Sequence, residues 1–575
     1  MLRGIFELSE FKEEVLDFVN NLSGFKIKDK AGEFIGTRMG RPEKGKLRKL
    51  AGSPNVLFPV GSEGGRLRSV QAACETGKVK GDFPLFYCKK CDKETIYRRC
   101  ERCDEVTQKK YFFYETKEKS FQKEKPGYEK SGVPHYYQNL DINYFLEKAR
   151  EKLKLDKVEM PLLIKGVRGL SSDGKMMENL AKGVLRAKFD LQVNKDGTIR
   201  FDATEMPLVY FKPKEIRVSV EKLKDLGYIL DIFGKELENS EQILELMPHD
   251  ILLPSAKESP NERADDVFFK VSKFVDEELE RFYCLKKFHE LKTREDLIGQ
   301  IGVCMAPHNC AGVICRFVGF SNTQGLLASP YMHAAIRRDC DGDEAAIMLL
   351  SDVLLNFSRK FLPSHRGGTQ DAPLVLNAKI DAGEVDDQIL DFEVVPEGHY
   401  PLELYQKAEM GLHSSEVKEI KIIKKILKEG KDPFINLGFT HDTSDINGGV
   451  VVSAYKLLPT MQDKVNHQMD LVEKIRAVDT SDIARLIIER HLIRDMRGNL
   501  RKFSMQGFRC VACNESLRRP PLSGVCPACG GKIIFTIHEG GIKKYLEPAM
   551  NLVKKYNLSP YIKQSLELTK RYIDS

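Results

Sequence analysis

The sequence contains no apolar run near the roughly 18 residues that a membrane-spanning helix needs, which excludes a membrane-embedded class. It also lacks a signal-peptide pattern, because the first seven residues, Met1 to Glu7, turn acidic at once. From these two absences we expect a cytoplasmic protein. The net charge is only +7 over 575 residues, so overall charge does not indicate a nucleic-acid partner, and local clusters must carry that argument.

Length and composition indicate a globular chain of several domains. A chain of 575 residues exceeds what one hydrophobic core supports, and its apolar content of 42% and charged content of 30% are typical of soluble proteins. We therefore expect a multidomain protein.

An acidic stretch at 337–344 is the most informative feature. Asp339, Asp341 and Asp343 alternate along the chain around Gly342, so an extended or looped backbone turns three carboxylates to one side. Their repulsion favours a hard divalent cation such as Mg²⁺, whose remaining positions water and phosphates fill. The plain alternative is a solvated acidic turn. The apolar run at 345–350 favours a rigidly held site instead.

A calcium loop of the EF-hand type is excluded. Such a loop needs Gly at position 6 and Glu at position 12, and counting from Asp339 these places hold Glu344 and Leu350.

Eight of the 14 cysteines form four Cys-x-x-Cys pairs, which in a cytosolic chain indicates metal binding. Two pairs make each site, and four thiolates with no open position predict structural zinc. The predicted ligands are Cys88, Cys91, Cys100 and Cys103 in the first site, and Cys510, Cys513, Cys526 and Cys529 in the second. We interpret the other six as small core residues, with a third site formed by Cys304, His308, Cys310 and Cys315 as a weaker alternative.

A basic segment lies near the start of the chain. Residues 38–49 hold six basic side chains against one acid, and nearby glycines and Pro42 argue against a regular helix. The segment is either a solvated loop or a phosphate-binding arm in which lysines act as point charges. The cationic residues are Arg38, Arg41, Lys44, Lys46, Arg48 and Lys49.

Hydrophobic patterns outline the elements between these motifs. We expect a linker or exposed arm at 108–135, a strand or short element at 184–193, a helix at 240–247 and a long helical tract at 463–494. Strands at 298–305, 312–320 and 326–329 lead into the acidic stretch. Asp202 and Glu205, on a strand at 198–204 and just beyond it, are lone acids that we interpret as structural.

Two motifs resemble a known family. The Asp-x-Asp-Gly-Asp pattern resembles the metal loop on the double-psi β-barrel of multisubunit RNA polymerases. The longer string from His333 through Arg337-Arg338 to Glu344 is similar to the large subunit of archaeal D-family DNA polymerase, DNA polymerase II. The basic string 38–44, followed by 58–61 and 63–66, also resembles that subunit. Asp339 departs from the family pattern, which more often has Asn there.

The resemblance implies a multidomain α+β fold with an RNA-polymerase-like double-psi barrel core. Its expected parts are the C-terminal part of a first barrel with the basic loop at 1–80, a zinc module at 81–110, an α+β accessory domain at 111–295, a second barrel with the acidic loop at 296–380, a mainly helical accessory domain at 381–505, a zinc ribbon at 506–540 and a helical tail at 541–575.

The same resemblance implies template-directed DNA synthesis with two Mg²⁺ ions. Asp341 and Asp343, with Asp339, would bind Mg²⁺, and Lys44, Lys46 and Lys49 would neutralise triphosphate charge. The nucleic-acid contacts would come from Arg38, Arg41, Arg66, Arg337, Arg338, Arg366, Arg497 and Arg501.

The family's large subunit is about twice this length. We therefore expect this chain to be inactive alone and to need an upstream large-subunit fragment, with proofreading in a separate small exonuclease subunit and the sliding clamp reached through other chains. The alternatives are a non-catalytic nucleic-acid-binding scaffold derived from the family and an RNA-polymerase-like nucleotidyltransferase.

Overall fold

The computed structural model describes most of the chain. The described residues are 15–27, 49–259, 262–338, 343–380, 390–394, 401–412, 416–418, 420–435, 445–448, 457–475, 478–512, 515–537 and 540–574. The basic segment up to residue 48 and positions 339–342 of the acidic stretch lie outside these ranges.

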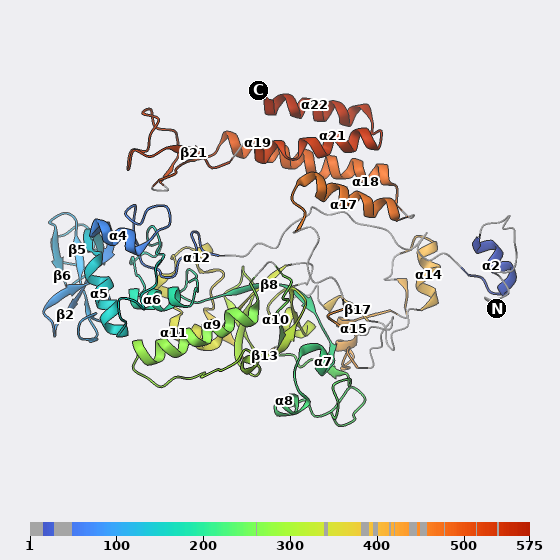
Figure 1. Cartoon of the computed structure of the whole chain (residues 1–575), viewed down its shortest axis with the longest axis horizontal. Coiled ribbons are helices and arrows are strands. Elements are labelled where there is room, and N and C mark those ends of the chain that lie inside the picture. The colour runs from blue at the N-terminus through green and yellow to red at the C-terminus, as the bar shows by residue number, and fades with distance from the viewer. Residues whose placement is uncertain are drawn as a thin grey trace.

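A first module precedes the central sheet and is coloured blue to cyan in Figure 1. Two capped helices shape it: Asp141 accepts from the Tyr144 amide at the start of one, and Asn179 accepts from the Ala181 amide at the start of the other. Its elements are α4 (Val70–Thr76), β1 (Lys78–Pro84), β2 (Phe86–Cys88), β3 (Lys93–Thr95), β4 (Gln108–Lys109), β5 (Tyr111–Phe113), β6 (Glu118–Ser120), β7 (His135–Asp141), α5 (Ile142–Leu153) and α6 (Leu180–Lys188). A separate helix, α2 (Val15–Ser23), lies before it in the chain.

A closed barrel of six strands forms the centre. The hydrogen-bonded order is β11–β14–β8–β15–β12–β13, and β13 pairs back with β11 to close the ring. The strands are β8 (Phe201–Pro207), β11 (Asp250–Pro254), β12 (Ile301–Met305), β13 (Ala311–Ser321), β14 (Gly325–Ala328) and β15 (Glu344–Leu349); β16 (Val375–Asn377) adds to β13 outside the ring. Parallel and antiparallel pairs mix, and β8 joins β14 and β15, which are remote from it in sequence.

Helices cover the barrel, and both faces of β15 are buried. Ala345, Ile347 and Leu349 belong to the main core, whereas Ala346 and Met348 pack in a second cluster with Val303 and Val353. The surrounding helices include α7 (Pro213–Ile216), α8 (Val220–Asp225), α9 (Ala264–Glu277) with a π-helical turn (Glu278–Phe282), α10 (Pro330–Ala335), α11 (Leu350–Asn356) and α12 (Arg366–Thr369). Two short strands, β9 (Tyr210–Phe211) and β10 (Leu244–Glu245), pair beside them.

The first module and the barrel share one hydrophobic core. The same cluster contains Phe58, Ile164 and Val184 of the module and Phe201, Phe317 and Ile347 of the barrel. The two regions are therefore one folding unit, and the barrel end is rigidly attached to the first cysteine-bearing sheet.

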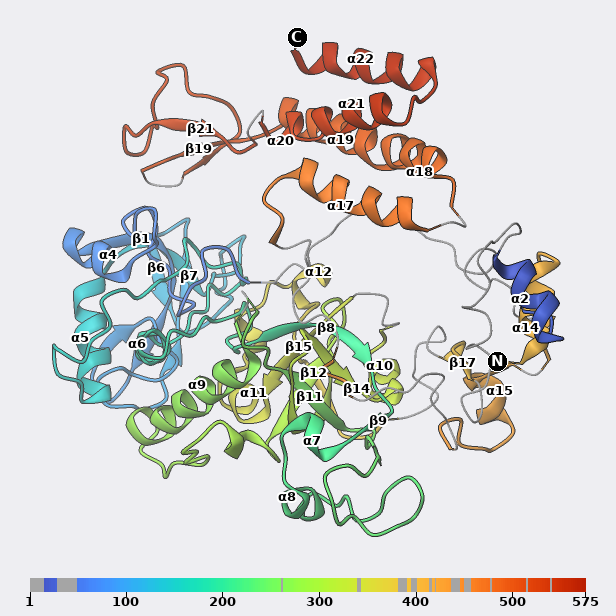
Figure 2. The same cartoon turned by 45° about the vertical axis from the view of Figure 1, so that its right-hand side comes forward.

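A helical unit in the C-terminal third has a core of its own. The centre of this core contains Val465, Ile488, Met496 and Leu552. The helical unit lies above the barrel in Figures 1 and 2. Its elements are α17 (Met461–Lys474), α18 (Thr480–Leu486), a π-helical turn (Ile487–Leu492), α19 (Ile493–Ser504), α20 (Gly540–Lys543), α21 (Leu546–Lys555) and α22 (Pro560–Asp574). The sheet β20–β19–β21 (Ser516–Leu517, Phe508–Cys510, Ile533–Phe535) interrupts it.

A smaller group of elements lies between the barrel and the helical unit in sequence. It contains β17 (Glu393–Val394), β18 (Lys421–Ile422), α14 (Leu402–Glu409) and α15 (Ile423–Lys428), with Val394, Ile423 and Phe434 in a small cluster of their own.

The predicted fold class, a multidomain α+β protein built on a β-barrel with two cysteine modules, is confirmed. The helical tract predicted at 463–494 is present as consecutive helices. The barrel, however, also takes β8 and β11, which precede the range 296–380 in which a second barrel was expected. The sequence does not show that β8 and β11 belong to the barrel, because the strands with which they pair are distant in the chain.

Several local predictions were wrong. Residues 180–188 form helix α6 where a strand or short element was expected, because the Asn179 cap and the buried Leu180, Val184 and Leu185 stabilise a helix. The segment 240–247 contributes strand β10, and the expected arm at 108–135 holds the hairpin β5–β6 with Phe113 buried. Of the cysteines expected in the core, Cys284 and Cys310 are exposed.

Within the described residues, no helix combines the length and apolar character needed to cross a membrane.

Candidate functional site

The acidic stretch joins α10 to β15 at one end of the barrel. Strand β15 pairs with β8 in the register Glu344↔Thr204, and the Glu205 amide donates to the Asp343 carbonyl at 3.0 Å. Asp343 is thus fixed at a barrel edge while its side chain is about half exposed, at 48%. The predicted ligands Asp339 and Asp341 lie outside the described residues.

The buried Arg338 side chain fixes the orientation of the Asp343 carboxylate. The Arg338 side chain is only 6% exposed, and its guanidinium donates to Oδ2 of Asp343 and, at 3.0 Å, to the Glu344 carbonyl. The preceding Arg337 takes a left-handed backbone angle (φ 63°), which ends α10 and sends the two arginines in different directions: Arg337 to solvent, Arg338 inward. The two adjacent arginines, predicted alike from sequence, therefore have different environments.

A buried carboxylate, Glu205, lies behind this pair. Neither of its oxygens has a hydrogen-bond partner among the described residues, and its Oε2 lies 3.5 Å from Nδ1 of His333. His333 is anchored through Nε2, 3.1 Å from the Met206 carbonyl. Burial raises the pKa of Glu205, His333 and Arg338 oppose that rise, and Asp343 adds to it.

Sequence analysis interpreted Glu205 as a lone structural acid and did not place it beside the acidic loop, where the structure has it. The available signal was the alternation along β8, in which Phe201, Ala203 and Glu205 are buried and Asp202 and Thr204 between them are only half-buried. That pattern puts an acid on the buried face, but only the pairing of β8 with β15 places it at the acidic loop.

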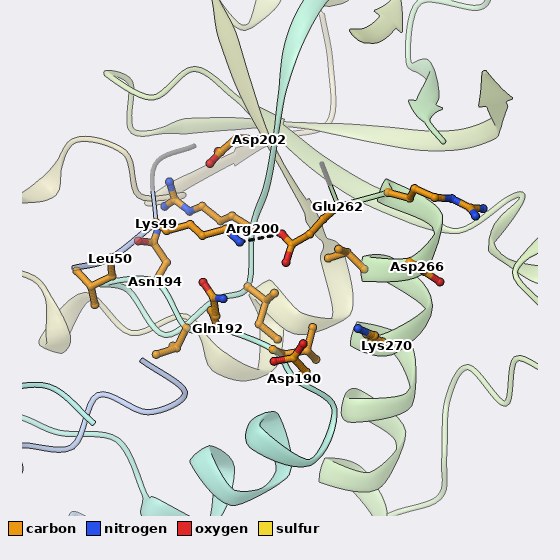
Figure 3. Close-up of a pocket in the computed structure, with 15 residues that line it drawn as sticks. Lys49, Leu50, Asp190, Gln192, Asn194, Arg200, Asp202, Glu262, Asp266 and Lys270 are labelled. Carbon is orange, nitrogen blue, oxygen red and sulfur yellow. Dashed lines mark hydrogen bonds and ion pairs between the residues drawn. The ribbon is translucent and has the colours of Figure 1, made fainter. Parts of the chain in front are cut away.

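Lys49 is the member of the basic segment that the structure describes. Its ammonium pairs with Glu262 at 2.8 Å, as Figure 3 shows. Lys49 and Glu262, with Arg200, Asp202 and Arg263, line two adjoining cavities of about 110 and 60 Å³ beside the barrel, and Asp343 is not among the residues that line them. Lys44 and Lys46, and with them Arg38 and Arg41, lie outside the described residues.

The segment that carries Arg366 is fastened to the same barrel end. The Asp371 amide donates to the Asn309 carbonyl at 2.8 Å, and the buried Arg200 donates to both the carboxylate and the carbonyl of Asp371. Arg366 is the first residue of the short helix α12, and the structure describes its backbone only. The sequence analysis did not predict this structural role of Arg200.

The remaining predicted cations are exposed and dispersed. Arg66 lies on the turn before α4, and Arg497 and Arg501 lie one turn apart on α19. Among the described residues, none of these three forms a hydrogen bond or ion pair with Asp343, and all three are exposed.

Both predicted cysteine sites have ligand atoms gathered within metal-binding distance. The thiols of Cys88, Cys91, Cys100 and Cys103 all lie within 4.8 Å of one another, and so do those of Cys510, Cys526 and Cys529, while Cys513 lies outside the described residues. Each cluster includes the last residue of the central strand of a three-stranded sheet. The first cluster belongs to β3–β2–β4 and the second to β20–β19–β21. Four thiols at these separations fit a closed tetrahedral site of the kind that holds zinc.

The weaker third site is not supported. Cys304 and Cys315 are buried in the barrel core, Cys310 is exposed, and among the described residues these positions do not form a metal-binding group.

The fold and site define a class of mixed α+β proteins with a closed β-barrel, an acidic residue fixed at the barrel edge and two cysteine clusters that suit zinc. Two family models identify the protein family within this class. The catalytic domain of DNA polymerase II large subunit DP2 matches residues 157–464, and the central domain of the same subunit matches residues 4–122. The chain belongs to this family of D-type DNA polymerase large subunits.

Individual relatives agree with the family match. The DNA polymerase II large subunit of Nanoarchaeum equitans is 45% identical over 599 aligned positions, which cover 97% of this chain and 48% of that protein. Those of Archaeoglobus fulgidus and Pyrococcus furiosus are 43% and 42% identical, over 98% of this chain in each case and 49% and 45% of the relative. The chain thus spans about half the length of the curated relatives that it matches.

Proposed function

We propose that this chain is the catalytic part of a replicative DNA polymerase, which adds deoxynucleotides to a primer 3′-hydroxyl under the direction of a template. One observation carries the proposal: Asp343 is fixed by Glu205 and Arg338 at the edge of a closed barrel, inside the region that matches a polymerase catalytic domain. A solvated acidic turn has no need of two such anchors.

In this proposal Asp341 and Asp343, with Asp339, hold Mg²⁺. Carboxylate oxygens suit this hard cation, and Arg338 engages only Oδ2 of Asp343, which leaves Oδ1 to a ligand. Magnesium bound there supplies activation of the primer hydroxyl and charge stabilisation on the departing pyrophosphate. Arg338 keeps the carboxylate in one orientation before substrate arrives, so less ordering remains to be done on binding.

The cations of the chain bind and orient the substrates. Lys44, Lys46 and Lys49 neutralise triphosphate charge; Lys49 must exchange its pair with Glu262 for a phosphate to do so. Arg337 and the arginines at positions 38, 41, 66, 366, 497 and 501 contact the template–primer backbone. The attacking group is the primer hydroxyl, and no side chain acts as a covalent nucleophile.

We further propose that each cysteine module holds one structural Zn²⁺. The first module is tied to the barrel through the shared core, with Ile96 and Tyr97 buried between the two cysteine pairs. Zinc then sets the position of the basic residues that surround it.

The proposed partners follow from the length of the relatives. Since they are about twice as long, an upstream large-subunit fragment would complete the enzyme, a small subunit would supply the proofreading exonuclease, and the sliding clamp would be reached through other chains. The substrates are template–primer DNA and deoxynucleoside triphosphates. A polymerase of this kind works on the chromosome, so we place the chain in the cytoplasm.

Primer extension tests the proposal. The chain is combined with the upstream fragment and the small subunit of the same organism, and extension is measured with deoxy- and with ribonucleotides. Asp343→Asn should reduce extension at least about a hundredfold, because it removes a charged metal ligand, while binding to template–primer stays within about twofold. Extension by ribonucleotides alone would identify an RNA-polymerase-like enzyme, and unchanged extension in Asp343→Asn would overturn the assignment of the site.

A further inference from the structure

A cavity of about 620 Å³ lies between the first cysteine module and the segment that follows α11. Three parts of the chain form most of its lining: the strand-and-turn region 98–109 of the module, the loop 172–176 and the segment 359–369, and Phe86 of β2 completes it. The cavity therefore exists only in the folded protein, and its walls belong to elements held together by the shared core.

The charged lining of this cavity is almost entirely positive. Arg98, Lys109, Arg359 and Lys360 line it, and Asp173 is its acidic residue. Within the described parts of the chain, none of these four cations has an ion-pair partner. Burial, and after it the charges of Lys360 and Lys123, lower the pKa of Lys109. Like charges held together in this way are relieved by an anion.

The rest of the lining suits a polymer better than a free ion. Val106, Met176 and Pro363 supply apolar surface, and Thr107 and Ser364 supply hydroxyl groups. The volume is several times what one phosphate fills, and the cations come from both sides of the cavity. Proteins hold a single nucleic-acid strand with cations along its phosphates and aromatic side chains against its bases, and Phe86 is an aromatic residue of this lining.

One wall of the cavity is also fastened to the barrel end that carries the acidic loop. Met305, the last residue of β12, pairs with Ala346 near the start of β15, so the turn after β12 and the acidic loop emerge at the same end. The carbonyl of Asn309 in that turn accepts from the Asp371 amide at 2.8 Å. Lys195 donates to the Gln370 carbonyl at 2.5 Å and holds the same segment, whose other end, 359–369, forms a wall of the cavity.

We propose that this cavity binds the phosphodiester backbone of a single nucleic-acid strand that passes between the acidic loop and the first cysteine module. The identity of the strand as the template of a synthesis reaction rests on the proposed function; the strand-binding cavity itself does not. The first cysteine module then has a task beyond its own fold: it carries Arg98 and Lys109 as one wall of the strand channel.

The test measures binding of a fluorescent 20-nucleotide oligothymidylate to the full chain by anisotropy, without magnesium or nucleotides, at several salt concentrations. The variant Lys109→Gln/Lys360→Gln should bind about tenfold more weakly, and the slope of log Kd against log salt should fall by about 1.4, because each lost phosphate contact to a single strand contributes about 0.7. The pair Arg98→Gln/Arg359→Gln provides a second, independent variant should the first fail to fold.

The matched control is Lys89→Gln/Lys93→Gln, which removes the same charge from exposed positions of the same module outside the cavity. It should change Kd less than twofold. Equal losses in control and cavity variants would mean general electrostatics and would overturn the proposal, as would an unchanged slope in both cavity variants. Competition by inorganic tripolyphosphate that depends on Lys109 and Lys360, with no effect of these variants on the oligonucleotide, would show a free-anion site instead.

This measurement is independent of primer extension. A chain that shows the predicted binding pattern but extends no primer keeps the strand channel and loses the proposed polymerase activity. A chain that extends primers with both cavity variants binding like the original protein keeps the activity and loses the channel.

Discussion

Two groups of buried charges differ in how completely their members are paired. The first, which we call the closed network, consists of Glu178, Lys182, Arg186, Glu278, Asp352 and Asn356. The second, the open pair, consists of Glu205 and His333 beneath the acidic loop. Both contain fully buried side chains, so burial alone does not distinguish them.

In the closed network each carboxylate oxygen has a hydrogen-bond or ion-pair partner, and among the described residues Oε1 of Glu278 has the ion pair with Lys182 alone. Arg186 donates to both oxygens of Glu178 at 2.8 and 2.7 Å, and Asn356 and the Ile199 amide donate to Asp352 at 2.9 and 2.7 Å. Glu278 accepts from Asn356 at 2.8 Å and pairs with Lys182 at 2.9 Å. The network joins α6, the π-helical turn after α9, and α11, which identifies its role as structural.

In the open pair both oxygens of Glu205 and Nδ1 of His333 lack a hydrogen-bond partner among the described residues. Such unsatisfied buried groups cost free energy, and native proteins keep them mainly where function needs them. The comparison teaches that hydrogen bonds are denser in the group of charges that joins the helices than in the pair beneath the acidic loop.

The largest expected effect comes from breaking the closed network. Arg186→Met leaves Glu178 buried without its cation and should lower the free energy of unfolding by about 3–5 kcal/mol, seen as a large drop in melting temperature. The double variant Glu178→Gln/Arg186→Met removes both charges and should recover much of the loss. A melting temperature of Arg186→Met within about two degrees of the original protein would contradict the structural role.

The open pair should respond in the opposite sense. Glu205→Gln removes a buried carboxylate that accepts no hydrogen bond from the described residues, so the melting temperature should stay the same or rise. It also leaves the positive charge of Arg338 opposed by Asp343 alone, so Mn²⁺ affinity, measured by electron paramagnetic resonance as a substitute for Mg²⁺, should fall about tenfold.

Glu215→Gln is the control for that change. Burial also raises the pKa of Glu215, but its carboxylate is satisfied by the amides of Lys212 and Ile446, remote from the acidic loop in sequence and contacts. Its Mn²⁺ affinity should be unchanged. Equal affinities in the two variants would remove Glu205 from the site.

The smallest expected effect is a pH dependence within the closed network. Burial raises the pKa of Asp352 to about 7, against the opposing charge of Arg186. Since the folded pKa lies above the ordinary value, Asp352 contributes most stability below that ordinary value and loses it as the pH rises toward 7. Between pH 6 and 8 the original protein should lose about 1 kcal/mol relative to Asp352→Asn, most of it below pH 7. Parallel urea-unfolding curves across this range would contradict the assignment.

Spacing in the sequence was enough for the parts that depend on local chemistry. The two cysteine sites were predicted from four Cys-x-x-Cys pairs, because a knuckle presents both thiols from one short segment, and every described member lies in its cluster. The strands leading to the acidic stretch were predicted from their apolar runs. The role of Asp339, Asp341, Lys44 and Lys46 stays a prediction, since they lie outside the described residues.

Long-range pairing decided what the sequence could not. Glu205 and Asp343 are far apart in the chain and meet only because β8 and β15 are neighbours in the ring. Lys49, predicted to bind triphosphate, is paired with Glu262, a partner that no local pattern indicates. The cationic cavity likewise draws its walls from segments that are distant in sequence.

By itself, then, the sequence determined the chemical inventory of this protein: an acidic loop, two sets of thiols and scattered cations. The tertiary structure alone decided which of these groups are satisfied and which are exposed to a ligand. The physical reason is that a side chain's charge and ligand type are local properties. Its desolvation and its partners depend on segments brought together only when the barrel closes.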